Sequence, residues 1–270
     1  MKRLLWLILL LAPVASADCP RIISQSPYIT HTLQWLELED CVVGVSRYDT
    51  LDRPTTGGVM DPDGEAIAAL DPELILTSDW TPPERLAEVT PDSARALTLH
   101  GFDDLDQIAA NLQRIGDAAG LASTEEQVDD FETQLERRLA AIDGHGLRAL
   151  LLSACSGVPY TFGPGTWLAE LFDRAGFETV ASQGDTHMLV GADPVDAIAD
   201  ELDTTRPDIV FLLEGNAGQC PTIRPAEPVP IVALEDERFL QPAPVLLGAL
   251  EQLAEKQHHW AHLSEDTRND

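Results

Sequence analysis

The sequence has very little positive charge. Its 270 residues contain 17 Lys and Arg against 46 Asp and Glu, which gives a formal net charge of −29 at pH 7. Lys2 and Lys256 are its only lysines. A surface with this charge repels nucleic acid and anionic lipid headgroups, so neither is an expected partner. We interpret the excess as a solvated acidic surface, which a halophilic source would explain.

Long apolar runs and common enzyme motifs are scarce as well. After the first dozen residues no apolar run reaches the length of about 20 residues that a membrane-spanning helix needs. The sequence has no G-x-S-x-G elbow, no G-x-x-x-x-G-K-[ST] phosphate loop and no H-E-x-x-H zinc motif. We therefore expect a protein that is not an enzyme and that carries no resident metal or cofactor.

The N-terminus has the three parts of a secretory signal peptide. Residues 1–3 form a basic head, residues 4–11 are apolar, and Ala15-Ser16-Ala17 places small residues where a signal peptidase cleaves. This pattern predicts a signal peptide over residues 1–17 and a mature chain that begins at Asp18. A retained N-terminal anchor is the alternative. In a Gram-negative bacterium the exported protein would be periplasmic.

Four cysteines remain in the mature chain, namely Cys19, Cys41, Cys155 and Cys220. An even number in an oxidising compartment favours disulfides over free thiols. There is no C-x-x-C and no nearby histidine pair, so the spacing does not predict a zinc site. Three pairings are possible.

Strands and helices alternate over the first hundred residues. The pattern predicts strands at 21–24, 42–45, 74–77 and 96–99, and helices at 28–38, 64–69 and 82–89. This alternation is typical of a doubly wound α/β lobe. Cys19 and Cys41 each precede a strand, and adjacent parallel strands would bring them to one sheet edge about 5 Å apart. We therefore favour their pairing.

Two consecutive helices without a strand between them follow, at 102–121 and 123–142. The second opens with Ser123 and Glu126, the spacing of a capping box. Its apolar residues recur every three to four positions, at Val128, Phe131, Leu135, Leu139 and Ile142. At 1.5 Å per residue this helix would be about 30 Å long. We expect it to connect two lobes.

A second α/β pattern then begins. Strands are predicted at 147–152, 178–181, 208–213 and 229–234, and helices at 166–175, 193–203 and 243–256. Cys155 and Cys220 both fall in loops after strands, which favours their pairing. The expected organisation is an N-terminal lobe at 18–121, a connecting helix at 122–144 and a C-terminal lobe at 145–270. Because ligands bind at the carboxyl ends of such strands, we expect a site between the lobes.

An ordered set of short segments resembles the periplasmic substrate-binding proteins of cobalamin and iron-siderophore ABC importers. The matching segments are 21–27, 42–48, Gly57-Gly58, 65–67, 70–76, 162–166, 206–210 and 242–253. The resemblance implies a class III fold, in which one long rigid helix joins two α/β lobes. It also implies a monomer that captures a corrinoid such as cobalamin and delivers it to an inner-membrane ABC permease. Haem or an iron-siderophore is the alternative ligand, and an exported enzyme is a weaker alternative.

Aromatic residues gather in the predicted loops after strands, where a ligand would bind. These are Tyr28, Tyr48, Trp80, Tyr160 and Phe162, in a chain with only 6% aromatics. A large planar ligand needs such flat walls, although local packing would also explain each residue. The resemblance adds His187 and Met188 near a pocket position where relatives often carry an aromatic. A His-Met pair would suit haem or another metal complex.

The resemblance also implies one acidic docking residue for the permease on each lobe. Glu65 matches in the N-terminal lobe, and Asp196 matches in the C-terminal lobe, with Glu201 as the alternative. All are on predicted helices, and helix N-termini favour acids in any case. The histidines His258, His259 and His262 near the C-terminus are interpreted as part of a solvated tail.

Overall fold

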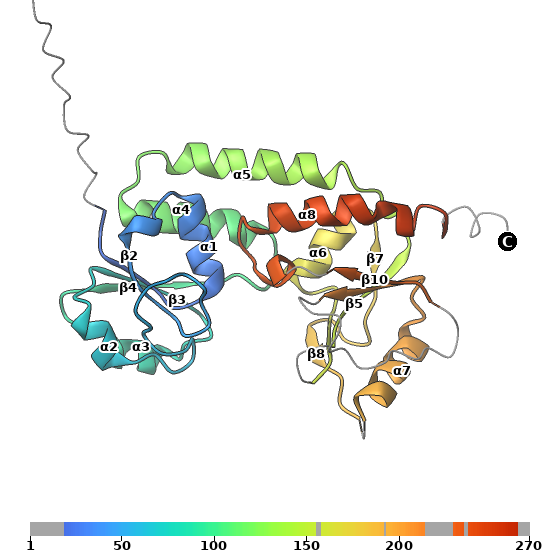
Figure 1. The fold of residues 1–270 in the computed structure, drawn as a ribbon, viewed down its shortest axis with the longest axis horizontal. Coiled ribbons are helices and arrows are strands. Elements are labelled where there is room, and N and C mark those ends of the chain that lie inside the picture. The colour runs from blue at the N-terminus through green and yellow to red at the C-terminus, as the bar shows by residue number, and fades with distance from the viewer. Residues whose placement is uncertain (1–18, 155–157, 192, 214–228, 235–236, 264–270) are drawn as a thin grey trace, which may run out of the picture.

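The computed structural model describes residues 19–154, 158–191, 193–213, 229–234 and 237–263. The predicted signal peptide at 1–17 and the predicted Cys155–Cys220 pair lie outside the described residues. Within the described ranges, no helix is long and apolar enough to cross a membrane. Figure 1 shows two α/β lobes side by side, with helices α5 and α8 along one side of the molecule.

The N-terminal lobe is built on a parallel four-stranded sheet in the order β2-β1-β3-β4. Its strands are β1 (Ile22–Ser24), β2 (Val42–Val45), β3 (Leu74–Ser78) and β4 (Arg95–Leu99). Its helices are α1 (Pro27–Trp35), α2 (Gly64–Ala69), α3 (Pro83–Val89) and α4 (Asp106–Ala119), and a 3₁₀ turn, η1, spans Glu39–Cys41. The predicted alternation of strands and helices is confirmed.

Side-chain alternation along the strands gives this sheet a core on each face. Ile22 and Leu74 pack in one cluster with residues of α1 and α4. Their neighbours Ile23 and Ile75 point to the opposite face and pack with residues of α2 and α3. Because successive strand residues face opposite sides, continuous apolar strands require helices on both faces.

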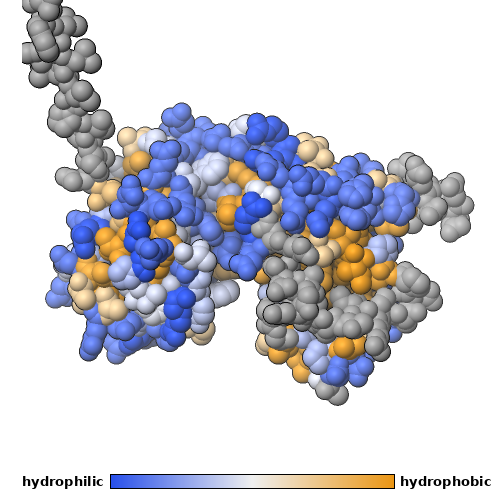
Figure 2. All heavy atoms as spheres, viewed as in Figure 1, coloured by the Kyte–Doolittle hydropathy of each residue, from blue (hydrophilic) through white to orange (hydrophobic). Residues whose placement is uncertain are grey.

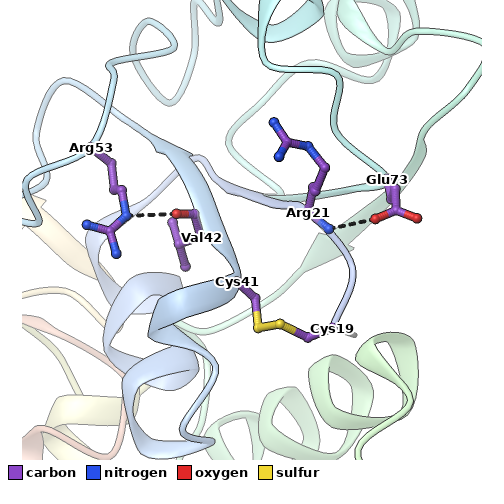
Figure 3. The surroundings of a disulfide bond; sticks show 6 residues. All are labelled: Cys19, Arg21, Cys41, Val42, Arg53 and Glu73. Atoms are coloured by element: carbon purple, nitrogen blue, oxygen red, sulfur yellow. Dashed lines mark hydrogen bonds between the residues drawn. A yellow bond between two sulfur atoms is a disulfide. The ribbon is translucent and has the colours of Figure 1, made fainter. Parts of the chain in front are cut away.

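The disulfide between Cys19 and Cys41 is confirmed, with the two Cα atoms 5.9 Å apart. Figure 3 shows the bond joining the segments that enter β1 and β2. Two further contacts hold the same edge, since the Arg21 amide donates to a Glu73 carboxylate oxygen (2.9 Å) and the Arg53 Nε donates to the Val42 carbonyl oxygen (2.8 Å).

The C-terminal lobe contains a mixed six-stranded sheet. Its main order is β10-β9-β5-β6-β8, and β7 also pairs with β5. The strands are β5 (Arg148–Ser153), β6 (Tyr160–Phe162), β7 (Glu178–Thr179), β8 (Thr186–Met188), β9 (Ile209–Leu213) and β10 (Ile231–Leu234). The helices are α6 (Trp167–Arg174), α7 (Pro194–Thr205) and α8 (Leu246–Glu255), with 3₁₀ turns η3 (Glu237–Leu240) and η4 (Lys256–His259). Sequence analysis did not predict β6 or β8, which pair antiparallel to their neighbours.

Helix α5 (Thr124–Leu139) packs against both lobes. Towards the N-terminal lobe, the Trp35 indole N–H donates to the Gln127 carbonyl oxygen at 3.2 Å. Towards the C-terminal lobe, Arg138 bonds the Leu247 carbonyl oxygen at 3.2 Å and pairs with Glu251 at 2.8 Å. The outer face of α5 and α8 is hydrophilic (Figure 2). The rigidity of this helix and the lobe boundaries at 121 and 144 stay predictions.

The predicted capping box at the start of α5 is wrong. Ser123 occupies the N-cap position, but its side chain makes no capping hydrogen bond. The Ser123 backbone is not in the extended conformation (φ −93°, ψ 11°) that normally aims an N-cap oxygen at the N3 amide. Instead, the Thr124 hydroxyl donates to the Leu121 carbonyl oxygen at 2.7 Å and closes the turn from α4.

Candidate functional site

Three large apolar side chains stand exposed on loops of the N-terminal lobe. Tyr48 follows β2, Met60 lies in the turn before α2, and Trp80 follows β3; their exposed fractions are 62%, 66% and 54%. We call these three residues the N-terminal wall. Tyr48 and Trp80 were predicted as site residues, whereas Met60 was not.

Hydrogen bonds hold the loops of the N-terminal wall together. The Arg47 amide donates to the Gly57 carbonyl oxygen at 2.7 Å, and the Arg47 guanidinium pairs with Asp61. The Thr81 hydroxyl donates to the Val59 carbonyl oxygen at 2.6 Å. The turn that carries Met60 is therefore bonded to the loops that carry Tyr48 and Trp80. These bonds limit the conformational freedom of the wall.

Phe102 supports the wall from behind. Its ring stacks on Trp80, with centroids 4.5 Å apart and planes inclined by 19°. The Phe102 ring also meets the Tyr28 ring edge to face, with centroids 5.5 Å apart. The Phe102 carbonyl oxygen also accepts a hydrogen bond from the Trp167 amide of the C-terminal lobe. Sequence analysis missed Phe102 because it placed this residue at the start of the predicted helix at 102–121, whereas α4 begins only at Asp106.

The structure places Tyr28 in the core, and this corrects its predicted role as a ligand contact. The side chain lies in α1 and is 1% exposed. Its hydroxyl donates to the Leu99 carbonyl oxygen at 3.2 Å. Burial raises the pKa of Tyr28 above its ordinary value. Tyr28 therefore supports Phe102 and Trp80 without reaching the surface itself.

On the C-terminal lobe, the residues predicted to contact a ligand lie on the pair of strands β6 and β8. Tyr160 lies opposite Met188, and Thr161 lies opposite His187. In the view of Figure 1, β8 is on the side of its sheet nearer to the N-terminal lobe. Tyr160 is half-buried and Met188 is 62% exposed, so this pair presents a partly apolar surface.

Two predictions for this pair of strands are corrected. Phe162 is 7% exposed, packs in the core and lies 5.4 Å from the Tyr160 ring, so it supports the surface rather than forming it. His187 and Met188 are neighbours in a strand, and neighbouring strand residues point to opposite faces. They therefore do not form a joint His-Met ligand set. The His187 Nε2 lies 3.2 Å from the Gln183 side-chain nitrogen.

A histidine and an aspartate lie together at the carboxyl ends of β3 and β4. The His100 Nδ1 is 2.8 Å from an Asp79 carboxylate oxygen, and the two side chains are 56% and 32% exposed. Ser78 and Leu99 are register partners, so their successors Asp79 and His100 are side by side. The sequence could have revealed the pair, because His100 directly follows the predicted strand at 96–99 and Asp79 lies two residues after the predicted strand at 74–77.

The three acidic residues considered for permease docking differ in their exposure to solvent. Glu65 is exposed in the first turn of α2, which Asp63 caps through the Glu65 amide at 3.0 Å. Asp196 is exposed in the first turn of α7. Glu201 is 5% exposed and accepts a hydrogen bond from the Ser182 amide at 2.8 Å, so it is a structural residue. The alternative that Glu201 is the docking acid is therefore not supported.

Three pockets lined by described residues lie away from the strand ends discussed above. One of about 570 Å³ lies between α4, α5 and α6, one of about 650 Å³ lies beside the disulfide, and one of about 400 Å³ lies between α1, α5 and α8. Among the described residues, no group of three or more His, Cys, Asp or Glu could hold a metal ion. His258, His259 and His262 are exposed near the C-terminus.

Solved structures share this fold over nearly their whole length. The haem-binding protein RhuT of Roseiflexus sp. RS-1 is 20% identical, with a TM-score of 0.70, over 88% of this chain and 98% of that one. The vitamin B12-binding protein BtuF of Vibrio cholerae is 20% identical, with a TM-score of 0.68, over 89% and 97%. The siderophore-binding protein BauB is 14% identical, with a TM-score of 0.65, over 88% and 93%.

No curated protein sequence matches the chain. The family profile described as periplasmic binding protein matches residues 22–219, which is more than half of the chain and includes strands of both lobes. The structure has two α/β lobes with mainly parallel sheets, an arrangement that matches the class III fold of BtuF. The chain therefore belongs to the periplasmic binding protein family.

Proposed function

We propose that this protein captures a corrinoid between its two lobes and delivers it to an ABC-type permease in the inner membrane. The N-terminal wall is the observation that carries this proposal. Tyr48, Met60 and Trp80 are exposed, apolar and held in place by bonded loops, which is what a large planar ligand requires. The likeness to BtuF supports a corrinoid. The family match favours a binding protein over an exported enzyme.

Calorimetry with cyanocobalamin tests the ligand. We expect one-to-one binding in the wild type and at least tenfold weaker binding in Trp80→Ala, because a flat contact surface is lost. Trp80→Phe should restore most of the affinity. Ile231→Ala is the matched control, since Ile231 is also an exposed apolar residue but lies at the amino end of β10. Equal affinity of Trp80→Ala and Ile231→Ala for cyanocobalamin would show that the N-terminal wall is not part of the binding site.

Haem is the second candidate ligand, and a ferric siderophore is the third. The likeness to RhuT and BauB favours both as strongly as the likeness to BtuF favours a corrinoid. The same titration with ferric haem and with ferric siderophores decides among the three. Binding of haem with no heat from cyanocobalamin would replace the corrinoid and leave the proposed transport role intact.

Glu65 and Asp196 are proposed as the docking contacts for the permease. Each is an exposed acid at the start of a helix, one helix per lobe, and α2 and α7 lie on the side of the molecule away from α5 (Figure 1). Both can therefore meet one partner with basic residues. Acidic side chains that lose water against basic residues of the permease contribute more to docking than an exposed ion pair contributes to folding.

The double variant Glu65→Ala, Asp196→Ala should keep ligand affinity within about twofold of the wild type. Its binding to the permease should weaken at least tenfold, which is about 1.4 kcal/mol. Asp106→Ala with Glu125→Ala is the matched control, because these are exposed first-turn acids of α4 and α5. Lost ligand binding with intact docking would reverse the assignment.

A further inference from the structure

We propose that His100, oriented by Asp79, supplies an imidazole nitrogen to the metal centre of the captured ligand. This inference rests on the proposed function, because it assumes a metal macrocycle in the cleft. It narrows that function to ligands whose metal has an exchangeable axial position. The His100 and Asp79 side chains belong to the two loops that leave β3 and β4 at their carboxyl ends.

The hydrogen bond to Asp79 determines which nitrogen of His100 is available. An ionised carboxylate only accepts hydrogen bonds, so the Nδ1 at 2.8 Å carries the proton. In the neutral ring, Nε2 then keeps its lone pair. Histidines that ligate metals usually donate their other ring N–H to a carboxylate or carbonyl, which fixes the ring and raises its basicity. His100 and Asp79 have this arrangement before any metal is present.

Backbone and side-chain contacts hold both members of the pair. The Asp79 amide donates to the Leu99 carbonyl oxygen at 3.0 Å, and the Ser78 hydroxyl donates to the second Asp79 carboxylate oxygen at 3.1 Å. The Asn111 amide group donates to the His100 carbonyl oxygen. The imidazole itself is 56% exposed. The pair is therefore positioned by buried neighbours while its free nitrogen stays accessible.

His100 lies in the loop next to the one that carries Trp80 of the N-terminal wall. Trp80 directly follows Asp79, and Trp80 stacks on Phe102, which is two residues after His100. A macrocycle that rests on the N-terminal wall would meet one nitrogen donor from the neighbouring loop after β4. Coordination is a ligand exchange, in which Nε2 donates its electron pair to the metal, the axial water leaves and no oxidation state changes.

This chemistry separates the candidate ligands. Ferric haem and aquocobalamin each offer the metal an exchangeable axial position. Cyanocobalamin holds its axial cyanide firmly, and a ferric ion enclosed by siderophore oxygens has no open position. His100 should therefore contribute to the binding of the first two ligands and contribute little to the binding of the other two.

The test compares aquocobalamin, cyanocobalamin and ferric haem on the full mature chain. We expect the wild type to bind at least one of aquocobalamin and haem with a change in the absorbance spectrum that reports nitrogen coordination. His100→Ala should lose that change and at least tenfold in affinity for the same ligand, with cyanocobalamin binding altered less than twofold. Added imidazole should restore the spectrum in His100→Gly. Asp79→Asn should retain the spectrum with affinity reduced about threefold to tenfold.

His31→Ala is the matched control, because His31 also bonds through Nδ1, to Gln34 at 3.0 Å, but lines the pocket between α1, α5 and α8. It should behave as the wild type. If a ligand binds with the same spectrum and affinity in the wild type and in His100→Ala, the inference is wrong while the proposed function stands. If none of the three ligands binds, both are wrong. The ligand that gives the coordination spectrum identifies the source as corrinoid or haem.

Discussion

Tyr28 shows how a residue in the first turn of a helix can support surface residues from within the core. Its ring supports Phe102, and its hydroxyl is held by the Leu99 carbonyl oxygen. Burial raises the pKa of Tyr28, so the folded protein keeps this hydroxyl neutral at pH values where the unfolded chain ionises it. The contribution of Tyr28 to stability is therefore fully present below the ordinary tyrosine pKa of about 10 and is lost as pH rises above it.

We predict that the free energy of unfolding falls by up to about 1.4 kcal/mol per pH unit above pH 10 through this group alone. Tyr28→Phe should lack that component, although it should be about 1 kcal/mol less stable near neutral pH because the Leu99 carbonyl loses a partner. Urea unfolding at pH 7, 10 and 11 measures both effects. Parallel pH dependence in the two proteins would contradict the assigned burial effect.

The same residue shows a limit of prediction from sequence. Tyr28, Tyr48, Trp80 and Phe162 were all predicted in loops after strands. Tyr48 and Trp80 are in such loops, whereas Tyr28 lies in α1 and Phe162 lies in β6. Only the packing decides which of them face solvent, since Tyr48 and Trp80 are exposed whereas Tyr28 and Phe162 are buried. The direction of a loop side chain depends on tertiary contacts and carries no periodic pattern.

Among the elements, those with local start and stop residues were predicted well. Helix α2 matches its predicted range of 64–69, because Asp63 caps it and Asp71-Pro72 ends it. Strands β6 and β8 were missed, since three residues are too few for an alternating pattern to be recognised. Because β8 was missed, the placement of His187 and Met188 on opposite faces of that strand was missed as well.

The disulfide between the entries to β1 and β2 provides the prediction at this scale. It closes a loop with a sequence separation of 22 residues. In the chain-entropy account, such a loop stabilises the folded state by about 3 kcal/mol. Cys19→Ala with Cys41→Ala should therefore lose about 2–4 kcal/mol in urea unfolding. Ligand affinity should change less than twofold, because the bond lies at the opposite ends of the strands from the N-terminal wall. A loss of unfolding free energy under about 1 kcal/mol would show that the unfolded chain gains little conformational freedom when the disulfide is removed.

At the scale of the whole molecule, the two lobes share one continuous core. A single cluster of buried residues includes Leu74 from the first sheet, Phe131 from α5 and Phe211 from the second sheet. Phe131 is 1% exposed and meets Trp35 edge to face at 6.1 Å. Opening one lobe would therefore expose apolar surface on the other. This coupling opposes the independent unfolding that two separate domains usually show.

We predict that the protein unfolds in one cooperative transition although it has two sheets. In calorimetry at about 0.15 M salt, where the repulsion among its acidic residues is screened, the calorimetric and van't Hoff enthalpies should agree. Phe131→Ala should lower stability by about 3–5 kcal/mol, because it leaves a cavity in the part of the core that α5 contributes. The exposed residue Asp130 lies next to it on α5, and Asp130→Ala should change stability by less than about 0.5 kcal/mol. Two resolved transitions in the wild type would mean that the shared core does not couple the lobes.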